Sequence, residues 1–176
     1  HYERSFSPSV ATLAMVGDIT QAEAVELFRP LETAWAAKDV PALSIPEPQN
    51  PPATALYFVD IPGARQSQIY VGHLALPRTS PDYYAAQVMN YQLGGNFNGV
   101  LNMILREEKG FTYGASSRFA GGLYPGTFAA SSSVMSAATK ESVQIFRDEI
   151  ARYREGGSPE TLDYTRNAMA LSSRRR

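Results

Sequence analysis

Apolar residues along this chain follow two spacings, one typical of β-strands and one typical of α-helices. Short apolar or alternating runs predict five strands, at residues 10–16, 56–61, 68–76, 111–119 and 127–134. Apolar residues that recur every three or four positions predict helices at about 20–38, 81–93, 97–109 and 139–154, and from 159 onward. The order of these elements predicts an α+β fold, a two-layer sandwich with helices packed on one face of a mostly antiparallel sheet.

Capping and turn residues support these boundaries. Thr20 and Glu23 have the spacing of a capping box at the start of the first helix. Gly110 is placed to supply the left-handed turn that commonly ends a helix. Gly156-Gly157 ends a later helix, and Ser158-Pro159 is a typical start for the last one. The turn sequence at 62–65 predicts that the strands on either side form an antiparallel pair, and the proline-rich stretch 41–52 predicts a linker or an extended segment.

Composition excludes several functions. The 176 residues include no cysteine and carry a formal net charge of -1. Without cysteine the chain has no disulfide, thiolate metal site or thiol nucleophile. The near-neutral charge gives no electrostatic basis for binding nucleic acid or an anionic membrane. No apolar stretch reaches the length that a transmembrane helix needs.

The length predicts a single domain over residues 1–176. The first residues, His1-Tyr2-Glu3-Arg4, are neither an initiator methionine nor a signal peptide, so we expect a fragment of a longer polypeptide. The basic run Arg174-Arg175-Arg176 is interpreted as a surface segment.

The residues give little support for a metal site or for a catalytic nucleophile. His1 and His73 have no second ligand at a useful spacing, and we expect His73 to be a core or edge residue of a strand. No serine lies in a Gly-x-Ser-x-Gly elbow. The serines of the last two predicted strands are expected to face solvent (Ser116, Ser117, Ser131, Ser132 and Ser133). Glu107 and Glu108 are adjacent and would point about 100° apart on a helix, so we interpret them as a solvated face.

The glycine-rich stretch 94–99 opens a helix, a geometry that can bind an anion or a backbone carbonyl. It lacks the pattern of a phosphate-binding loop and does not follow a strand as a dinucleotide fingerprint does. We therefore interpret it as a joint between two helices.

Arg106 and Tyr113 form the most informative pair of side chains. They lie seven residues apart on either side of Gly110, one in the last turn of a predicted helix and the other at the start of a predicted strand. Both could face one groove at the helix–strand corner, where a guanidinium and a phenol would bind a peptide carbonyl or a developing oxyanion. The alternative is structural, because arginine suits a helix C-terminus and tyrosine suits a strand.

From Tyr2 to about Ser172 the sequence resembles the second domain of M16 zinc peptidases, the pitrilysin, insulinase and mitochondrial processing peptidase type. The resemblance rests on Val16-Gly17-Asp18, on Leu93-Gly94-Gly95, and above all on the segment 105–113, Leu-Arg-Glu-Glu-Lys-Gly-Phe-Thr-Tyr. Many members carry a Ser-Arg pair shortly before this segment, where this chain has Asn98-Gly99-Val100. This departure affects the substrate contacts that the resemblance implies at these residues, and it does not affect the fold.

The resemblance implies a half of a peptidase. In this family two homologous α+β halves enclose a chamber, and one half carries an inverted His-x-x-Glu-His zinc motif. The other half lacks it and contributes an Arg/Tyr pair, which here would be Arg106 and Tyr113. Tyr113 would hydrogen-bond the scissile carbonyl, and Arg106 would help to orient the substrate backbone. The partner half would bind the zinc, on the same polypeptide or on a separate subunit, and the peptide would add as a strand along a sheet edge.

Two functional classes stay open. The first is the non-zinc half of an active zinc endopeptidase, bacterial in style and of the cell envelope. The second is an inactive structural or assembly domain, like the core proteins of respiratory complexes. The presence of both Arg106 and Tyr113 favours the first class, because a scaffold has no need of the pair.

Overall fold

The computed structural model describes residues 1–42, 44–156 and 158–173. Two sequence predictions involve residues outside the described ranges: the helix end at Gly157 and the surface segment 174–176. Contacts divide the chain into two compact units, His1–Pro46 and Glu47–Arg176, and each is described by itself. The single domain over 1–176 stays a prediction.

The first unit contains a short helix α1 (Tyr2–Ser5), a 3-10 turn η1 (Pro8–Val10) and the helix α2 (Gln21–Ala34). The predicted capping box is present at the start of α2. The backbone N–H of Glu23 donates to Oγ1 of Thr20 at 3.3 Å, and the N–H of Thr20 donates to the Glu23 carboxylate at 2.9 Å. Ser7 is the anchor of this unit, because its hydroxyl donates to the carbonyl of Lys38 at 2.7 Å and accepts from the Lys38 N–H at 2.9 Å.

The predicted strand at 10–16 is wrong. Val10 ends the turn η1, and the residues that follow it up to 16 form neither helix nor strand. Leu13 and Val16 are exposed. An apolar run becomes a strand only where another strand supplies ladder hydrogen bonds, and the described residues of this unit contain none.

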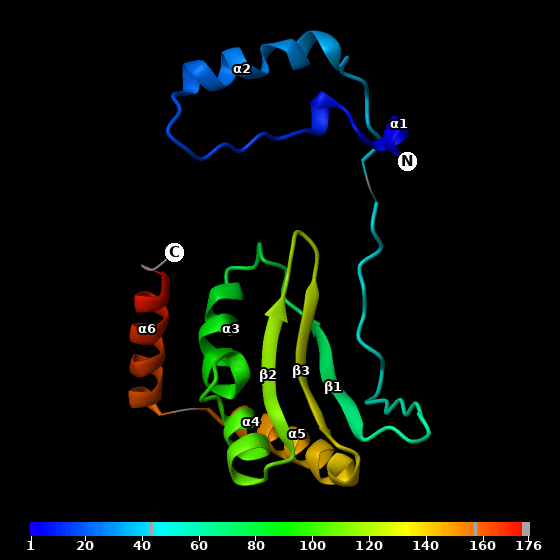
Figure 1. Cartoon of the computed structure of the whole chain (residues 1–176), viewed down its shortest axis with the longest axis vertical. Helices are drawn as coiled ribbons and strands as arrows, with labels where there is room; N and C mark the ends of the chain where they lie inside the picture. The colour runs from blue at the N-terminus through cyan, green and yellow to red at the C-terminus, as the bar shows by residue number, and fades with distance from the viewer. Residues whose placement is uncertain (43, 157, 174–176) are drawn as a thin grey trace. The chain divides into compact units, whose positions relative to one another are not determined.

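The second unit contains a three-stranded antiparallel sheet, built from β1 (Gln66–Ala75), β2 (Thr112–Ala120) and β3 (Gly126–Met135). The strand order is β1-β3-β2, so β3 is central and the other two are edges (Figure 1). Ser132 of β3 lies opposite Ile69 on one side and Ala115 on the other. The α+β class and the antiparallel sheet are confirmed.

Helices connect and cover these strands. Helix α3 (Tyr83–Asn90) continues into the π-helical turn η2 (Tyr91–Gly95), and α4 (Val100–Asn102) continues into a second π-helical turn, η3 (Met103–Glu108). After β3 follow the 3-10 turn η4 (Ser136–Ala138), α5 (Thr139–Tyr153) and α6 (Pro159–Ser173). The Ser158 hydroxyl accepts the N–H of Thr161 at 3.3 Å, as expected for a helix start.

The core lies between one face of the sheet and the helices. Leu101, Leu105 and Phe146 from the helices pack with Val134 and Ala130 of β3, and all five are fully buried. The side chains of β3 alternate between this face and the opposite one. Tyr70 and Arg118 are exposed on the opposite face. Packing of helices on one face agrees with the sequence prediction.

The predicted strand at 56–61 is also wrong. No residue of this segment belongs to a strand, and its five apolar side chains are exposed. The predicted turn is present, because the N–H of Ala64 donates to the carbonyl of Ile61 at 3.1 Å and Gly63 has φ +79. However, Asn50 is the residue that reaches the neighbouring edge, where its side-chain oxygen accepts the N–H of Leu74 at 2.8 Å. The segment 56–61 is therefore left without ladder partners.

None of the helices built from the described residues is long and apolar enough to cross a membrane.

Candidate functional site

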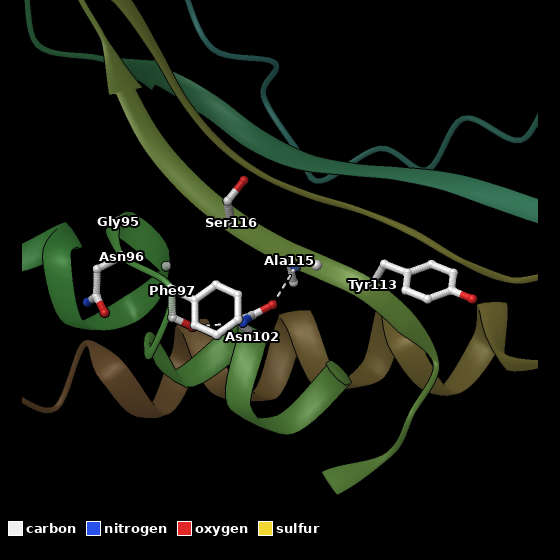
Figure 2. Close-up of a pocket in the computed structure, with 9 residues that line it drawn as sticks. Gly95, Asn96, Phe97, Asn102, Tyr113, Ala115 and Ser116 are labelled. Carbon is white, nitrogen blue, oxygen red and sulfur yellow. Dashed lines mark hydrogen bonds between the residues drawn. The ribbon is translucent and has the colours of Figure 1, made fainter. Parts of the chain in front are cut away.

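A shallow pocket of about 400 Å³ lies where the strand β2 faces the segment between η2 and α4. Figure 2 shows its two walls, with Phe97 and Asn96 on the loop side and Tyr113 and Ser116 on the strand side. The lining residues are Gly94, Gly95, Asn96, Phe97, Asn102, Tyr113, Gly114, Ala115 and Ser116. The pocket thus joins the glycine-rich stretch to the strand that carries Tyr113.

A β-bulge places Tyr113 at this pocket. The register between β2 and β3 shifts between Thr112 and Ala115, so that two residues of β2 stand opposite one residue of β3. Ala115 faces the core, and unbroken alternation would put Tyr113 on the same buried face. The extra residue breaks the alternation, and Tyr113 is 91% exposed.

Hydroxyl groups hold the bulge in shape. The N–H of Gly114 donates to Oγ1 of Thr112 at 3.1 Å, and the Thr112 hydroxyl donates to the Ser133 carbonyl at 2.7 Å. The Ser132 hydroxyl lies 2.9 Å from Oγ1 of Thr112 and 2.8 Å from the Gly114 carbonyl oxygen. The phenol of Tyr113 makes no hydrogen bond in the described part of the chain and so presents a free hydroxyl.

Arg106 lies behind the opposite wall. Its guanidinium carbon is 4.6 Å from the centroid of the Phe97 ring, a cation–π contact. One guanidinium nitrogen, Nη1, is buried and lies 3.2 Å from Oε1 of Glu107, without the alignment of a hydrogen bond. Among the described contacts Arg106 and Tyr113 do not touch each other. Phe97 is the residue that connects Arg106 to the pocket.

The corner between Arg106 and Tyr113 is built by Gly110, as its position in the sequence predicts. Gly110 has φ +64, its N–H donates to the carbonyl of Arg106 at 3.1 Å, and the N–H of Phe111 donates to the carbonyl of Leu105 at 2.9 Å. Each bond spans one residue more than its counterpart in a Schellman motif, as fits the π-helical turn η3 that precedes it. The helical segment ends at Glu108 with Lys109 as its C-cap, and β2 begins at Thr112.

Asn102 fastens the two walls together. Its side-chain nitrogen donates to the carbonyl of Phe97 at 2.7 Å, and its side-chain oxygen accepts the N–H of Ala115 at 3.0 Å. The residue is 2% exposed. A single buried amide thus fixes the Phe97 backbone relative to β2, two residues beyond Tyr113.

Side-chain amides also close the outer edge of β2. Asn90 donates to the carbonyl of Ser117 at 2.8 Å, and Gln87 donates to the carbonyl of Phe119 at 3.1 Å. Together with the bond from the Ala115 N–H to Asn102, these contacts engage one outward backbone group at each of Ala115, Ser117 and Phe119. In contrast, the outward groups of β1 at Gln68, Tyr70 and Gly72 make no hydrogen bond among the described residues.

The segment that carries Phe97 is held close to the sheet. Gly94 lies against β2, and a Cβ there would stand 2.6 Å from the backbone nitrogen of Ser117. The side chain of Asn96 donates to the carbonyl of Tyr91 at 2.5 Å and accepts the N–H of Asn98 at 2.8 Å. π-helical turns, which are frequent at functional sites, precede and follow this segment.

Sequence reasoning named Arg106 and Tyr113 but missed Phe97, Asn102 and Ser116. The stretch 94–99 was expected to be only a helix joint, whereas it forms one wall of the pocket. The glycine after Tyr113 is a signal for the bulge, since glycine inside a strand often marks one.

Two expectations about polar residues are resolved by the structure. The serines of β2 and β3 do not all face solvent: Ser117 and Ser132 are buried, and they bond to Asn90 and to Thr112. His73 lies in β1 with its ring 5.3 Å from that of Phe128, as expected for a strand residue. No three His, Cys, Asp or Glu side chains gather to form a metal site in the described ranges.

Comparisons with known proteins give a consistent result. The family described as the peptidase M16 inactive domain matches residues 1–169. A solved structure of a peptidase M16 inactive domain from Pseudomonas fluorescens is similar, with a TM-score of 0.79 and 27% identity over 90% of this chain. Comparison with the curated proteins gives no match.

Two further solved structures share the fold. A protease from Helicobacter pylori has a TM-score of 0.67 at 18% identity over 89% of this chain, and a conserved protein from Enterococcus faecalis has 0.66 at 21% over 89%. This chain spans 38%, 39% and 36% of the lengths of the three structures. The match over 1–169 shows that the chain belongs to the M16 peptidase family, as its inactive domain.

Proposed function

We propose that this chain is the half of a zinc-dependent M16 peptidase that binds the peptide and stabilises the transition state, while a homologous partner half holds the zinc. The observation that carries the proposal is the free phenol of Tyr113 at the rim of a pocket whose opposite wall contacts Arg106. Membership of the M16 family makes a peptide the expected ligand.

Tyr113 is proposed as the residue that donates a hydrogen bond to the scissile carbonyl. The bulge turns its ring out of the sheet, and no described residue occupies its hydroxyl. A hydroxyl donor beside the scissile carbonyl would stabilise the negative charge that develops on the carbonyl oxygen.

Arg106 is proposed to orient the substrate backbone. Its side chain is 33% exposed, and its charge is offset only in part by the adjacent carboxylate of Glu107. A guanidinium offers several N–H donors in a fixed plane, which suits two carbonyl groups of one extended peptide. The ring of Phe97 supports that plane from one side.

The sheet edges limit how a peptide binds to this half. Strand addition along β2 between Ala115 and Phe119 would displace the bonds from Asn102, Asn90 and Gln87. We therefore infer that the peptide meets this half through the pocket and the two named side chains, and that strand pairing, if it is used here, takes place on β1.

The described residues of this chain do not fit a zinc site, because no cluster of three potential ligands is present among them. The metal and its activated water are assigned to the partner half. Whether that half is a part of the same polypeptide or a separate subunit does not alter the roles of Arg106 and Tyr113.

The test is the substitution Tyr113→Phe in the complete protein, with the zinc-binding half present. The loss of one oxyanion donor lowers kcat by about 10²-fold or more, so we expect a decrease of that order in peptide cleavage. The measurement is the steady-state rate with a fluorogenic peptide.

Tyr124→Phe is the matched control, because Tyr124 is a half-exposed tyrosine in the turn between β2 and β3. We expect it to leave the rate unchanged. A Tyr113→Phe protein with the full rate would disprove the role of Tyr113. A complete protein that cleaves no peptide would favour the structural-domain alternative.

A further inference from the structure

The pocket beside Tyr113 is uncharged. Its nine lining residues include no Asp, Glu, Lys, Arg or His, and four of them are glycine or alanine on the loop side and the strand side alike (Gly94, Gly95, Gly114 and Ala115). A charged side chain that entered it would lose water and gain no partner of opposite charge, which is unfavourable.

The two amides of the pocket are already occupied within the protein. Asn96 bonds to Tyr91 and Asn98, and Asn102 bonds to Phe97 and Ala115. The hydroxyls of Tyr113 and Ser116 have no partner among the described residues, and both point away from Phe97 (Figure 2). An occupant therefore gains mainly contact with carbon atoms, among them those of the exposed ring of Phe97.

Phe97 is 65% exposed although its backbone is fixed. Its carbonyl accepts the bond from the buried side chain of Asn102, and the turn in which it lies is closed by the N–H of Gly99 to the carbonyl of Asn96 at 3.0 Å. One face of its ring meets the guanidinium of Arg106, while the residue also lines the pocket. An aromatic ring held out of the core by a rigid turn is well placed to contact a ligand.

We propose that this pocket is a specificity subsite for an apolar side chain of the bound peptide, aromatic or branched aliphatic, and that Phe97 is the residue that determines the preference. The inference rests on the proposed function, since it assumes a peptide bound next to Tyr113. The volume of about 400 Å³ lies toward the lower end of the range for ligand pockets.

The experiment uses the complete protein and a set of fluorogenic peptides derived from one cleaved sequence. Each position is replaced in turn by Phe, Leu, Ala, Glu or Lys. We expect one position at which Phe and Leu give a higher kcat/KM than Ala, and at which Glu and Lys give the lowest values. In Phe97→Ala we expect the advantage of Phe over Ala at this position to fall by about tenfold, the scale of lost apolar contact in a pocket.

Three variants separate this inference from other effects. Phe97→Trp keeps a large ring and is expected to keep the preference. Arg106→Lys tests the loss of the guanidinium, and it is expected to lower kcat/KM for all peptides alike. Tyr113→Phe lowers the rate for all peptides and leaves the preference unchanged.

The outcomes are distinct. If Tyr113→Phe has no effect, the proposed function fails, and this inference fails with it. If Tyr113→Phe lowers every rate but Phe97→Ala lowers kcat/KM equally for all peptides, the subsite alone is disproved. A wild-type protein that shows equal rates for Phe and Glu at every position also overturns the subsite.

Discussion

At the scale of single residues, the two side chains that matter most are set by their neighbours. Tyr113 is exposed because one extra residue in β2 reverses its direction, and Arg106 is held against Phe97. The same two residue types at the same spacing, without Phe97, would leave Arg106 without this cation–π contact. Spacing along the chain therefore identifies candidates, and the neighbours determine what they can contact.

The role of Arg106 leads to a prediction. Arg106→Lys retains the positive charge but loses the planar set of donors, so we expect kcat/KM for peptide cleavage to fall by about tenfold in the complete protein. Arg118→Lys, on the exposed face of β2, is the matched control and is expected to have no effect. Equal losses in both variants would argue against a specific contact with the peptide.

At the scale of secondary-structure elements, buried amides connect the helices to the sheet edge. Asn90 and Asn102 are both almost fully buried. Asn90 bonds to Ser117 of β2 through both ends of its amide, whereas Asn102 bonds to Ala115 of β2 through its oxygen and to the Phe97 carbonyl through its nitrogen. They differ in position, because only Asn102 lines the pocket. The two residues form a natural pair for separating stability from function.

We expect Asn90→Ala and Asn102→Ala each to lower the free energy of unfolding by about 1–3 kcal/mol, because each leaves buried polar groups without partners. Asn98→Ala, in the exposed loop, is expected to change it by less than about 0.5 kcal/mol. Urea unfolding measures all three. In peptide cleavage, only Asn102→Ala is expected to alter the preference at the subsite, and a similar change in Asn90→Ala would contradict that assignment.

Elements whose signals are local could be predicted from the sequence. The capping box of Thr20 and the end of a helix at Gly110 depend on a few adjacent residues, and both are present. The strands β1, β2 and β3 were predicted because one face of each is buried. The segments 10–16 and 56–61 have similar patterns, but a pattern does not state whether a neighbouring strand is available. The bulge at Tyr113 depends on Ser132, which lies far along the chain.

At the scale of the whole molecule, two contacts made by α5 involve titratable groups whose pKa is raised. The hydroxyl of Tyr153 in α5 donates to the carbonyl of Met89 in α3 at 2.7 Å, and burial raises the pKa of Tyr153. The hydrogen bond from Lys109 to Glu141, at 2.7 Å, raises the pKa of Lys109. A group with a raised pKa in the folded state stabilises the fold below its ordinary pKa, and this contribution is lost as the pH rises through the folded value.

We therefore expect the free energy of unfolding to decrease as the pH rises above about 10, where unperturbed tyrosine and lysine titrate. Tyr153→Phe removes one of the two groups and should make this decrease less steep. Urea unfolding at a series of pH values between about 8 and 11 measures the slopes. A Tyr153→Phe protein with the same slope as the wild type would show that Tyr153 does not contribute.

The two edges of the sheet differ in how their outward backbone groups are hydrogen-bonded. Next to the pocket, three side-chain amides each bond one outward backbone group of the β2 edge, whereas the outward groups in the middle of the β1 edge have no partner among the described residues. An added strand is therefore favoured beside β1, where β1 and β3 would separate it from β2 and Tyr113. We therefore expect a strand that is added beside β1 to leave the pocket next to Tyr113 accessible.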